Sequence, residues 1–267
     1  MKPDKAPPRA REFLENLASS GRYHFTSAEA QAALALSKSA TAMALNRLAR
    51  REAIASTARG FYVIVPPEYR RLGCLPAEQF IPALMKQLGL PYYAGLLTAA
   101  QYHGAAHQRP QEFQVFLDGP RRALACGRVR VGFIVRKRLR EVPVQEVNTA
   151  RGTLRVSTPE ATALDLVGYQ HQAGGLGQVA AVLTELAERL DPAKLPTVAK
   201  SAPLPWAQRL GFLLEHVDAA AQAAPLKDFV RARAHESALL LPKAPRGKAQ
   251  RDDGWKLYIN TKVEPAL

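Results

Sequence analysis

Residues 37–65, SKSATAMALNRLARREAIASTARGFYVIV, decide how the N-terminal part of the chain folds. Ser37 can cap a helix that runs from Lys38 to about Arg51, because its hydroxyl can accept a hydrogen bond from the backbone of the first turn. Two short apolar runs follow, Ile54 to Ser56 and Phe61 to Val65, and the turn between them contains a glycine. Apolar runs around such a turn are typical of a β-hairpin. The segment therefore predicts a helix followed by a hairpin.

Two further helices are predicted before this segment. The first begins near Pro8, buries an apolar face that includes Phe13, and ends at Ser19–Gly21. The second begins at Thr26, which forms a capping box with Glu29 three residues later. Three helices and a hairpin are the layout of a winged helix-turn-helix, in which the third helix is the recognition helix. Pro66-Pro67 ends the pattern, so the first domain is predicted over residues 1–67.

The third helix divides into two faces at 100° per residue. Its inner face is predicted to carry Thr41, Ala44, Leu45 and Leu48. The outer face is small and polar near its start and basic toward its end, which suits entry into a major groove. Asn46 could pair with an adenine edge, and Lys38 with a guanine or a phosphate. The predicted DNA-binding residues are Lys38, Ser39, Ala42, Met43, Asn46, Arg47, Arg50, Arg51 and, at the hairpin tip, Arg59.

The charge balance supports a polyanionic partner. The chain carries 37 Lys and Arg against 23 Asp and Glu, a net charge of +14. Residues 1–75 alone hold twelve basic and six acidic side chains, so the excess is local as well as global. Nucleic acid is favoured over anionic lipid because no long apolar or amphipathic anchor accompanies the charge. The alternative is a structural or protein-interaction module whose basic face is merely solvated.

Composition also predicts where the protein works. Its 47% hydrophobic and 22% charged residues are those of a globular chain. The first dozen residues lack the apolar core of a signal peptide, and no run of about 18 apolar residues predicts a membrane span. Cys74 and Cys126 are isolated in the sequence and have no metal-type spacing. We therefore expect a cytoplasmic protein with no membrane partner and no disulfide scaffold.

The remaining residues, 68–267, are expected to form a larger C-terminal domain with a subdivision near 195–205. Residues 92–102, YYAGLLTAAQY, predict a buried helix, and residues 157–160, STPE, predict the start of another. The predicted strands are Glu112–Asp118, Val129–Val135, Val142–Val147 and Thr153–Val156. Their alternation predicts an antiparallel sheet covered on one side. The fold class is therefore α+β, a winged helix-turn-helix followed by a mixed domain with packed helices.

An enzymatic second domain is the alternative reading. Carboxylates near the predicted strand ends could hold Mg²⁺ in a nuclease-like site; they are Asp118, Glu141, Glu146 and Asp165. No lysine completes a nuclease strand motif, however, and no DxD occurs. His103 and His107 could share a metal but lack a third ligand, so a helix end is favoured. The glycines of residues 174–177, GGLG, favour a helix-helix turn over a phosphate loop. We predict no catalytic residues, metal or cofactor.

Basic residues also gather on the predicted sheet. Between Arg109 and Arg155 lie eleven Lys or Arg and four acids. Along the strand that starts at Val129, alternation places Arg130 and Arg136 on the polar face. Either this is a second nucleic-acid surface or it is a sheet face kept soluble by arginine. The residues are Arg121, Arg122, Arg128, Arg130, Arg136, Lys137, Arg138 and Arg140.

The order of motifs along the chain resembles a known family. After the predicted winged helix come YYAGLLTAAQYHG (92–104), FLDGPRR (116–122), STPEATALDLV (157–167), AQRLGFLLE (207–215) and DDGWKLYINTKVE (252–264). As an ordered set they resemble the AbiEi antitoxins, the transcriptional-regulator half of type IV abortive-infection toxin-antitoxin pairs in phage defence. The similarity spans about Pro8 to Glu264.

The resemblance implies a function for each part. The winged helix would bind inverted repeats in the promoter of its own operon and repress it. The C-terminal part would counteract a nucleotidyltransferase toxin, in this class of system generally without a stable complex. The family motifs carry no established catalytic residues. Members differ in how the C-terminal part is built, so DNA binding transfers more safely than antitoxin activity. Three alternatives stay open: direct binding of the toxin, a stand-alone regulator, and a nucleic-acid-processing enzyme targeted by its winged helix.

Overall fold

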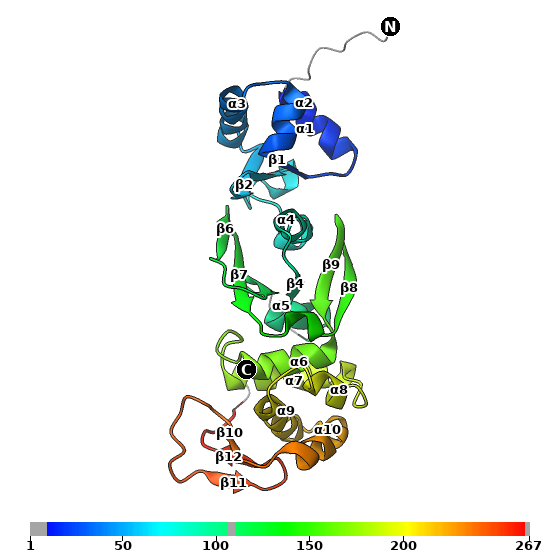
Figure 1. Ribbon diagram of the computed structural model, residues 1–267, viewed down its shortest axis with the longest axis vertical. Coiled ribbons are helices and arrows are strands. Elements are labelled where there is room, and N and C mark those ends of the chain that lie inside the picture. The colour runs from blue at the N-terminus through cyan, green and yellow to red at the C-terminus, as the bar shows by residue number, and fades with distance from the viewer. Residues whose placement is uncertain (1–9, 106–109, 265–267) are drawn as a thin grey trace.

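The computed structural model describes residues 10–105 and 110–264, and its elements stack along one long axis (Figure 1). An N-terminal unit of three helices lies at one end, a curved sheet in the middle, and a group of helices with a small second sheet at the other end. The predicted helix start at Pro8, the second histidine of the candidate metal pair, His107, and Arg109 lie outside the described residues.

The N-terminal unit contains the helices and the hairpin that the sequence predicts. Its elements are α1 (Ala10–Ser19), β1 (His24–Thr26), α2 (Ser27–Leu34), α3 (Lys38–Arg50), β2 (Ile54–Ala58) and β3 (Phe61–Ile64). The strand β1 was not predicted; it pairs with β3 in a sheet of order β1-β3-β2. The capping box is formed: Thr26 N donates to Glu29 Oε2 at 2.7 Å, and Glu29 N donates to Thr26 Oγ1 at 3.2 Å.

The middle level is a six-stranded sheet of order β6-β7-β5-β4-β9-β8. Its strands are β4 (Tyr92–Ala94), β5 (Phe113–Leu117), β6 (Leu124–Cys126), β7 (Val129–Val135), β8 (Val144–Thr149) and β9 (Gly152–Ser157). The sheet is mixed, because β5 pairs with β7 and β4 with β9 in parallel, so the prediction of an antiparallel sheet was only partly right. Two strands were missed in the prediction: the first three residues of the predicted helix over 92–102 form β4, and β6 reverses the chain between β5 and β7, which therefore run parallel.

Gly95 separates that strand from α5 (Leu96–Tyr102). A Cβ at Gly95 would lie 2.4 Å from the ring of Phe116, so only glycine lets the backbone pass this ring. The strand β4 also shows why the sheet is covered on both sides and not on one. Tyr92 and Ala94 join one hydrophobic core, while Tyr93 between them joins another.

The two cores lie on opposite faces of the sheet. One face curves around α4 (Ile81–Leu88), where Leu84 and Met85 are fully buried (Figure 1). This core also takes in Phe61 and Val63 of β3, so the β2–β3 hairpin packs on the sheet. Two 3₁₀ turns, Pro67–Tyr69 and Ala77–Gln79, lie between the hairpin and α4.

The other face packs against the C-terminal helices. These are α6 (Pro159–Gly168), α7 (Leu176–Leu186), α8 (Leu195–Ala199), α9 (Leu204–His216) and α10 (Ala220–Arg233), with a small sheet of β10 (Ala238–Leu239), β11 (Gln250–Asp252) and β12 (Leu257–Ile259). Thr158 caps α6 as predicted, accepting from Ala161 N at 3.4 Å. Trp255 is fully buried against Gly211, where a Cβ would lie 2.0 Å from its ring.

The cysteines are nearer to each other than the sequence suggests. Cys74 and Cys126 are both free thiols, and both are buried in the core around α4.

In the part of the chain that the structure describes, no helix is both long and apolar enough to cross a bilayer.

Candidate nucleic-acid interface

The predicted recognition helix α3 is fixed at its start by hydrogen bonds within its first turn. The hydroxyl of Ser37 accepts from Ala40 N at 3.2 Å, and Thr41 Oγ1 donates to Ser37 O at 2.9 Å. The inner face is buried as predicted; it consists of Thr41, Ala44, Leu45 and Leu48. Because this face packs against α1 and α2, the outer face has a defined direction.

The outer face of α3 is open to solvent along its whole length. Every predicted contact residue of the helix and of the residue after it is exposed: Lys38, Ser39, Ala42, Met43, Asn46, Arg47, Arg50 and Arg51. Met43 is 62% exposed, an unusual value for a large apolar side chain. Within the described ranges, none of the four cations on this face forms an ion pair with a carboxylate. The face therefore offers positive charge that no acidic side chain of the described chain neutralises.

The hairpin tip is rigidly placed next to this unit. Arg59 is exposed, and Gly60 follows it with φ +74°, a conformation that favours glycine. Ser27 N at the start of α2 donates to Gly60 O at 2.9 Å. The strand β3 contributes Phe61 to the core of the middle sheet and Ile64 to that of the N-terminal unit. Because β3 packs in both cores, the backbone of the hairpin is anchored on two sides, and Arg59 lies at its exposed tip.

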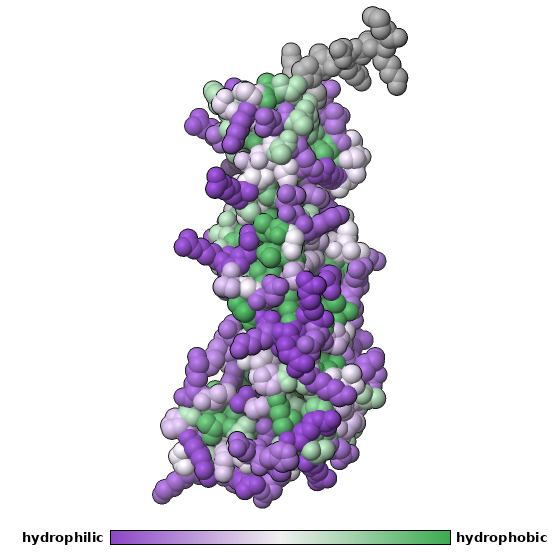
Figure 2. Space-filling view, viewed as in Figure 1, coloured by the Kyte–Doolittle hydropathy of each residue, from purple (hydrophilic) through white to green (hydrophobic). Residues whose placement is uncertain are grey.

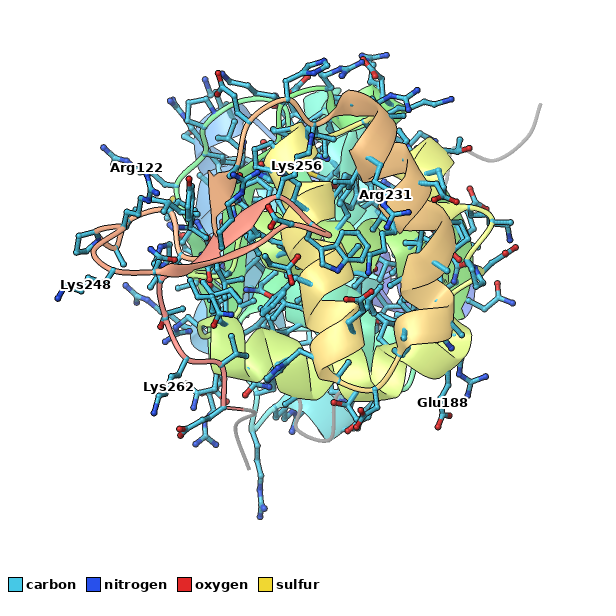
Figure 3. All side chains as sticks on the ribbon, turned by 90° about the horizontal axis from the view of Figure 1, so that it is seen from below. Arg122, Glu188, Arg231, Lys248, Lys256 and Lys262 are labelled. Carbon is cyan, nitrogen blue, oxygen red and sulfur yellow. The ribbon has the colours of Figure 1, made fainter. Side chains whose placement is uncertain are left out.

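Seven of the eight basic residues predicted on the sheet are accessible, but they do not form one patch. Arg128 and Arg130 flank the start of β7, whereas Lys137, Arg138 and Arg140 follow its end, so the length of the strand, roughly 20 Å, separates the two groups. Arg121 lies over the ring of Phe133, 5.5 Å from its centroid. Arg122 projects away from the body of the protein (Figure 3).

The eighth residue, Arg136, was wrongly predicted to lie on the basic surface. It is 2% exposed, and its Nε donates to Asp165 Oδ1 at 3.0 Å. Its other nitrogens donate to Lys137 O at 2.9 Å and to Ser201 O at 3.3 Å, and its guanidinium lies 4.8 Å from the Trp206 ring. The strand ends at Val135, so the alternation that predicted exposure no longer applies at the next residue.

Electrostatics favour the ionised form of this buried arginine. Burial alone would lower the pKa of Arg136, but attraction to Asp165 and the hydrogen bond between them outweigh it and raise that pKa. The second oxygen of Asp165 accepts from Tyr93 Oη at 2.7 Å. The network connects β4 and the end of β7 to α6, α8 and α9 in the interior of the protein. Both carboxylate oxygens of Asp165 accept hydrogen bonds within it, from Tyr93 and from Arg136.

The carboxylates of the enzymatic alternative do not meet. Asp165 is enclosed in this network, whereas the other three are exposed on separate elements: Asp118 after β5, Glu141 after β7 and Glu146 on β8. Glu141 is paired with Arg138 through a hydrogen bond of 2.8 Å. Over residues 10–105 and 110–264, no three His, Cys, Asp or Glu side chains gather closely enough to hold a metal ion. No observation here favours a nuclease.

His103 and the glycines of residues 174–177 have structural roles. His103 caps the end of α5, and its Nε2 lies 2.8 Å from Ser157 O. Burial lowers the pKa of this imidazole, so it is neutral near pH 7. Gly174 and Gly175 have φ of +87° and +95° in the turn between α6 and α7. The helix-end and turn interpretations are thus confirmed.

Residues 93–216 match the family described as the AbiEi antitoxin C-terminal domain. This match confirms the AbiEi resemblance. The matched segment begins in β4 and ends with α9, so it includes most of the middle sheet and the buried Arg136–Asp165 pair.

Solved structures add information on the fold. The RV2827C protein from Mycobacterium tuberculosis has a TM-score of 0.67 at 15% identity, over 95% of this chain and 94% of that chain, and so has the same overall fold. An antigenic nucleotidyltransferase-like protein from Paracoccidioides brasiliensis reaches 0.40 at 11% identity, over 57% of this chain and 90% of its own. That similarity is too low to support an argument. No curated protein matches the sequence significantly.

Proposed function

We propose that the protein is a sequence-specific DNA-binding repressor of its own operon that also acts as the antitoxin against a nucleotidyltransferase toxin. The observation that carries the DNA-binding part is the outer face of α3. It is exposed, backed by a buried inner face, and lined by cations that form no ion pair with an acidic side chain among residues 10–105 and 110–264. Uncompensated positive charge on a rigid helix is the electrostatic footprint of a protein that contacts phosphates.

Within a winged helix-turn-helix, the residues of this face divide into two roles. Ser39 and Ala42 are small and let the helix approach the floor of the major groove. Asn46 reads an adenine edge, and Met43 supplies apolar contact for a neighbouring thymine methyl group. The cations position the helix on phosphates without specifying sequence; they are Lys38, Arg47, Arg50, Arg51 and, from the wing, Arg59.

A second contact with DNA is proposed for the edge of the middle sheet. The strand β2 packs beside β6, and Arg128 N donates to Leu72 O at 2.7 Å, so the β6–β7 turn lies next to the N-terminal unit. Hydrophilic residues project along the flank that carries α3, β2 and β6 (Figure 2). Arg128 and Arg130 can therefore extend the phosphate contacts beyond the helix. The distant group around Arg138 is a solvated surface in this proposal.

Binding to the DNA upstream of the protein's own gene tests the repressor function. Fluorescence anisotropy should show tighter binding to the inverted repeats of that DNA than to random duplex, with affinity falling as salt rises. Asn46→Ala should relax base preference, and Arg59→Ala should weaken binding to all sequences alike. Arg231→Ala is the matched control, because this exposed arginine lies on α10, at the other end of the molecule. Equal affinity for upstream and random duplex would exclude the repressor function.

The antitoxin function is supported by the AbiEi match and is separable from DNA binding. Co-expression with the nucleotidyltransferase toxin should restore growth, and Asn46→Ala should preserve this protection because the helix lies outside the matched residues 93–216. We propose that the protein exerts this effect in the cytoplasm, without catalysis of its own and without a stable complex with the toxin. Co-purification of the two proteins would instead support direct binding.

A further inference from the structure

The only two cysteines of the chain are brought together by segments that are far apart in sequence. The segment 72–74, which follows the N-terminal unit, lies against the turn between β6 and β7. A Cβ at Gly127 would lie 2.7 Å from the carbonyl carbon of Gly73, so the two backbones are in van der Waals contact there. Together with the Arg128–Leu72 hydrogen bond, this contact places the segments in opposite directions. Cys74 therefore lies opposite Cys126.

The thiols of these residues interact directly. Cys74 is fully buried and Cys126 is 5% exposed, and the two share one hydrophobic core. The interaction between the two thiols is the largest influence on both groups: it raises the pKa of Cys74 and lowers that of Cys126. Opposed residues of antiparallel segments have Cα atoms about 4.5–5.5 Å apart. A disulfide needs about 4.4–6.8 Å, so the backbone does not have to move far to form one.

We infer that Cys74 and Cys126 are a modification site, a dithiol that a small peroxide converts reversibly into an intramolecular disulfide. Cys126 reacts first, because it is the less buried of the two and its neighbour Cys74 lowers its pKa. Its thiol loses a proton, the thiolate attacks one oxygen of hydrogen peroxide, and the O–O bond breaks to give a sulfenic acid and hydroxide. The hydroxide takes up the released proton and becomes water. The Cys74 thiolate, having lost its proton to solvent, then attacks the Cys126 sulfur and displaces hydroxide, which takes up a proton. Overall, two thiols and one peroxide give one disulfide and two waters.

The crosslink would join the exit of the N-terminal unit to an edge strand of the sheet. The same core holds Phe61 of the hairpin, and β2 packs beside β6, so the bond would reinforce the docking of the N-terminal unit. A disulfide that closes the loop from Cys74 to Cys126 lowers the conformational entropy of the unfolded chain and so stabilises the folded protein. The oxidised protein is thus expected to unfold at a higher temperature than the reduced protein. The inference does not depend on DNA binding or on antitoxin activity.

Mass spectrometry of the full-length protein tests the site. Reduced, dilute protein is treated with hydrogen peroxide, quenched with catalase, and alkylated with N-ethylmaleimide in denaturant. The expected product has lost two hydrogens and carries no N-ethylmaleimide adduct. Its digest contains a peptide in which Cys74 is linked to Cys126, and dithiothreitol returns it to the dithiol. The midpoint of thermal unfolding should be higher in the oxidised protein and should return to the original value after reduction. Two adducts after oxidation, or disulfides only between chains, would overturn the inference.

Two variants identify which thiol reacts first. In Cys74→Ala, the sulfenic acid on Cys126 has no resolving thiol, so dimedone should trap it. In Cys126→Ala, dimedone labelling of Cys74 should be much slower. Equal labelling of both variants would contradict the order of reaction. The wild-type measurement decides the existence of the site even if a variant fails to fold.

Discussion

Removing the positive charge of Arg136 should be one of the most destabilising single changes in the protein. The side chains of Arg136 and Asp165 are 3% and 1% exposed, so Arg136→Met leaves a buried carboxylate whose remaining side-chain partner is Tyr93. Breaking a buried ion pair by removing one partner costs about 3–5 kcal/mol. That is a large part of the roughly 5–15 kcal/mol by which domains are stable. The lost stacking on Trp206 is part of this cost.

Urea unfolding followed by tryptophan fluorescence measures this cost. Arg138→Met is the matched control, because Arg138 pairs with Glu141 at the surface and is 56% exposed; its loss should cost less than about 1 kcal/mol. The double variant Arg136→Met, Asp165→Leu should regain most of the stability, because no unpaired charge stays buried. A cost for Arg136→Met no larger than that of the control, or a double variant less stable than the single one, would show that the buried pair does not contribute in this way.

Three further outcomes follow from the packing. Burial lowers the pKa of His103, so below about pH 6.5 the unfolded chain binds a proton at this imidazole more readily than the folded chain does. The stability of the folded protein should therefore fall as the pH drops below that value. His103→Gln should flatten this part of a curve of Tm against pH. Gly211→Ala should cost about 1–3 kcal/mol by displacing Trp255, seen as a red-shifted emission, whereas Gly119→Ala, with open space around it, should be nearly neutral. Arg151→Met should loosen the N-terminal unit, because its guanidinium lies 3.4 Å from the Tyr23 ring centroid, and limited proteolysis should then cut near residue 66 faster.

The periodic parts of the structure were predictable from sequence, and the parts set by distant partners were not. The faces of α3 follow from 100° per residue, and the capping box of α2 from residue types three positions apart. Arg136 was misplaced because its partner, Asp165, is 29 residues away and no local pattern marks the pair. The strand β4 was read as helix because both its faces are buried, which removes the alternation that identifies a strand.

The candidate interface shows the same division. Its exposed helix face could be read from the sequence, because the exposure of a helical residue is largely a local property. The two groups of basic residues along β7 could not be separated without the strand order, which sets their distance from the N-terminal unit. The meeting of Cys74 and Cys126 likewise depends on how the segment after the hairpin docks on β6.

Competition binding on the protein's own upstream DNA measures whether the exposed face of α3 reads a specific sequence. Labelled upstream duplex, bound to wild-type protein at fixed salt, is displaced by unlabelled upstream DNA or by random duplex. Specific regulators prefer their site by about 10³-fold or more, and Asn46→Ala should lose about 1–3 kcal/mol of discrimination at one base pair. Random duplex should therefore compete at least about a thousandfold less well than upstream DNA. Equal competition by both duplexes, unchanged in Asn46→Ala, would contradict it.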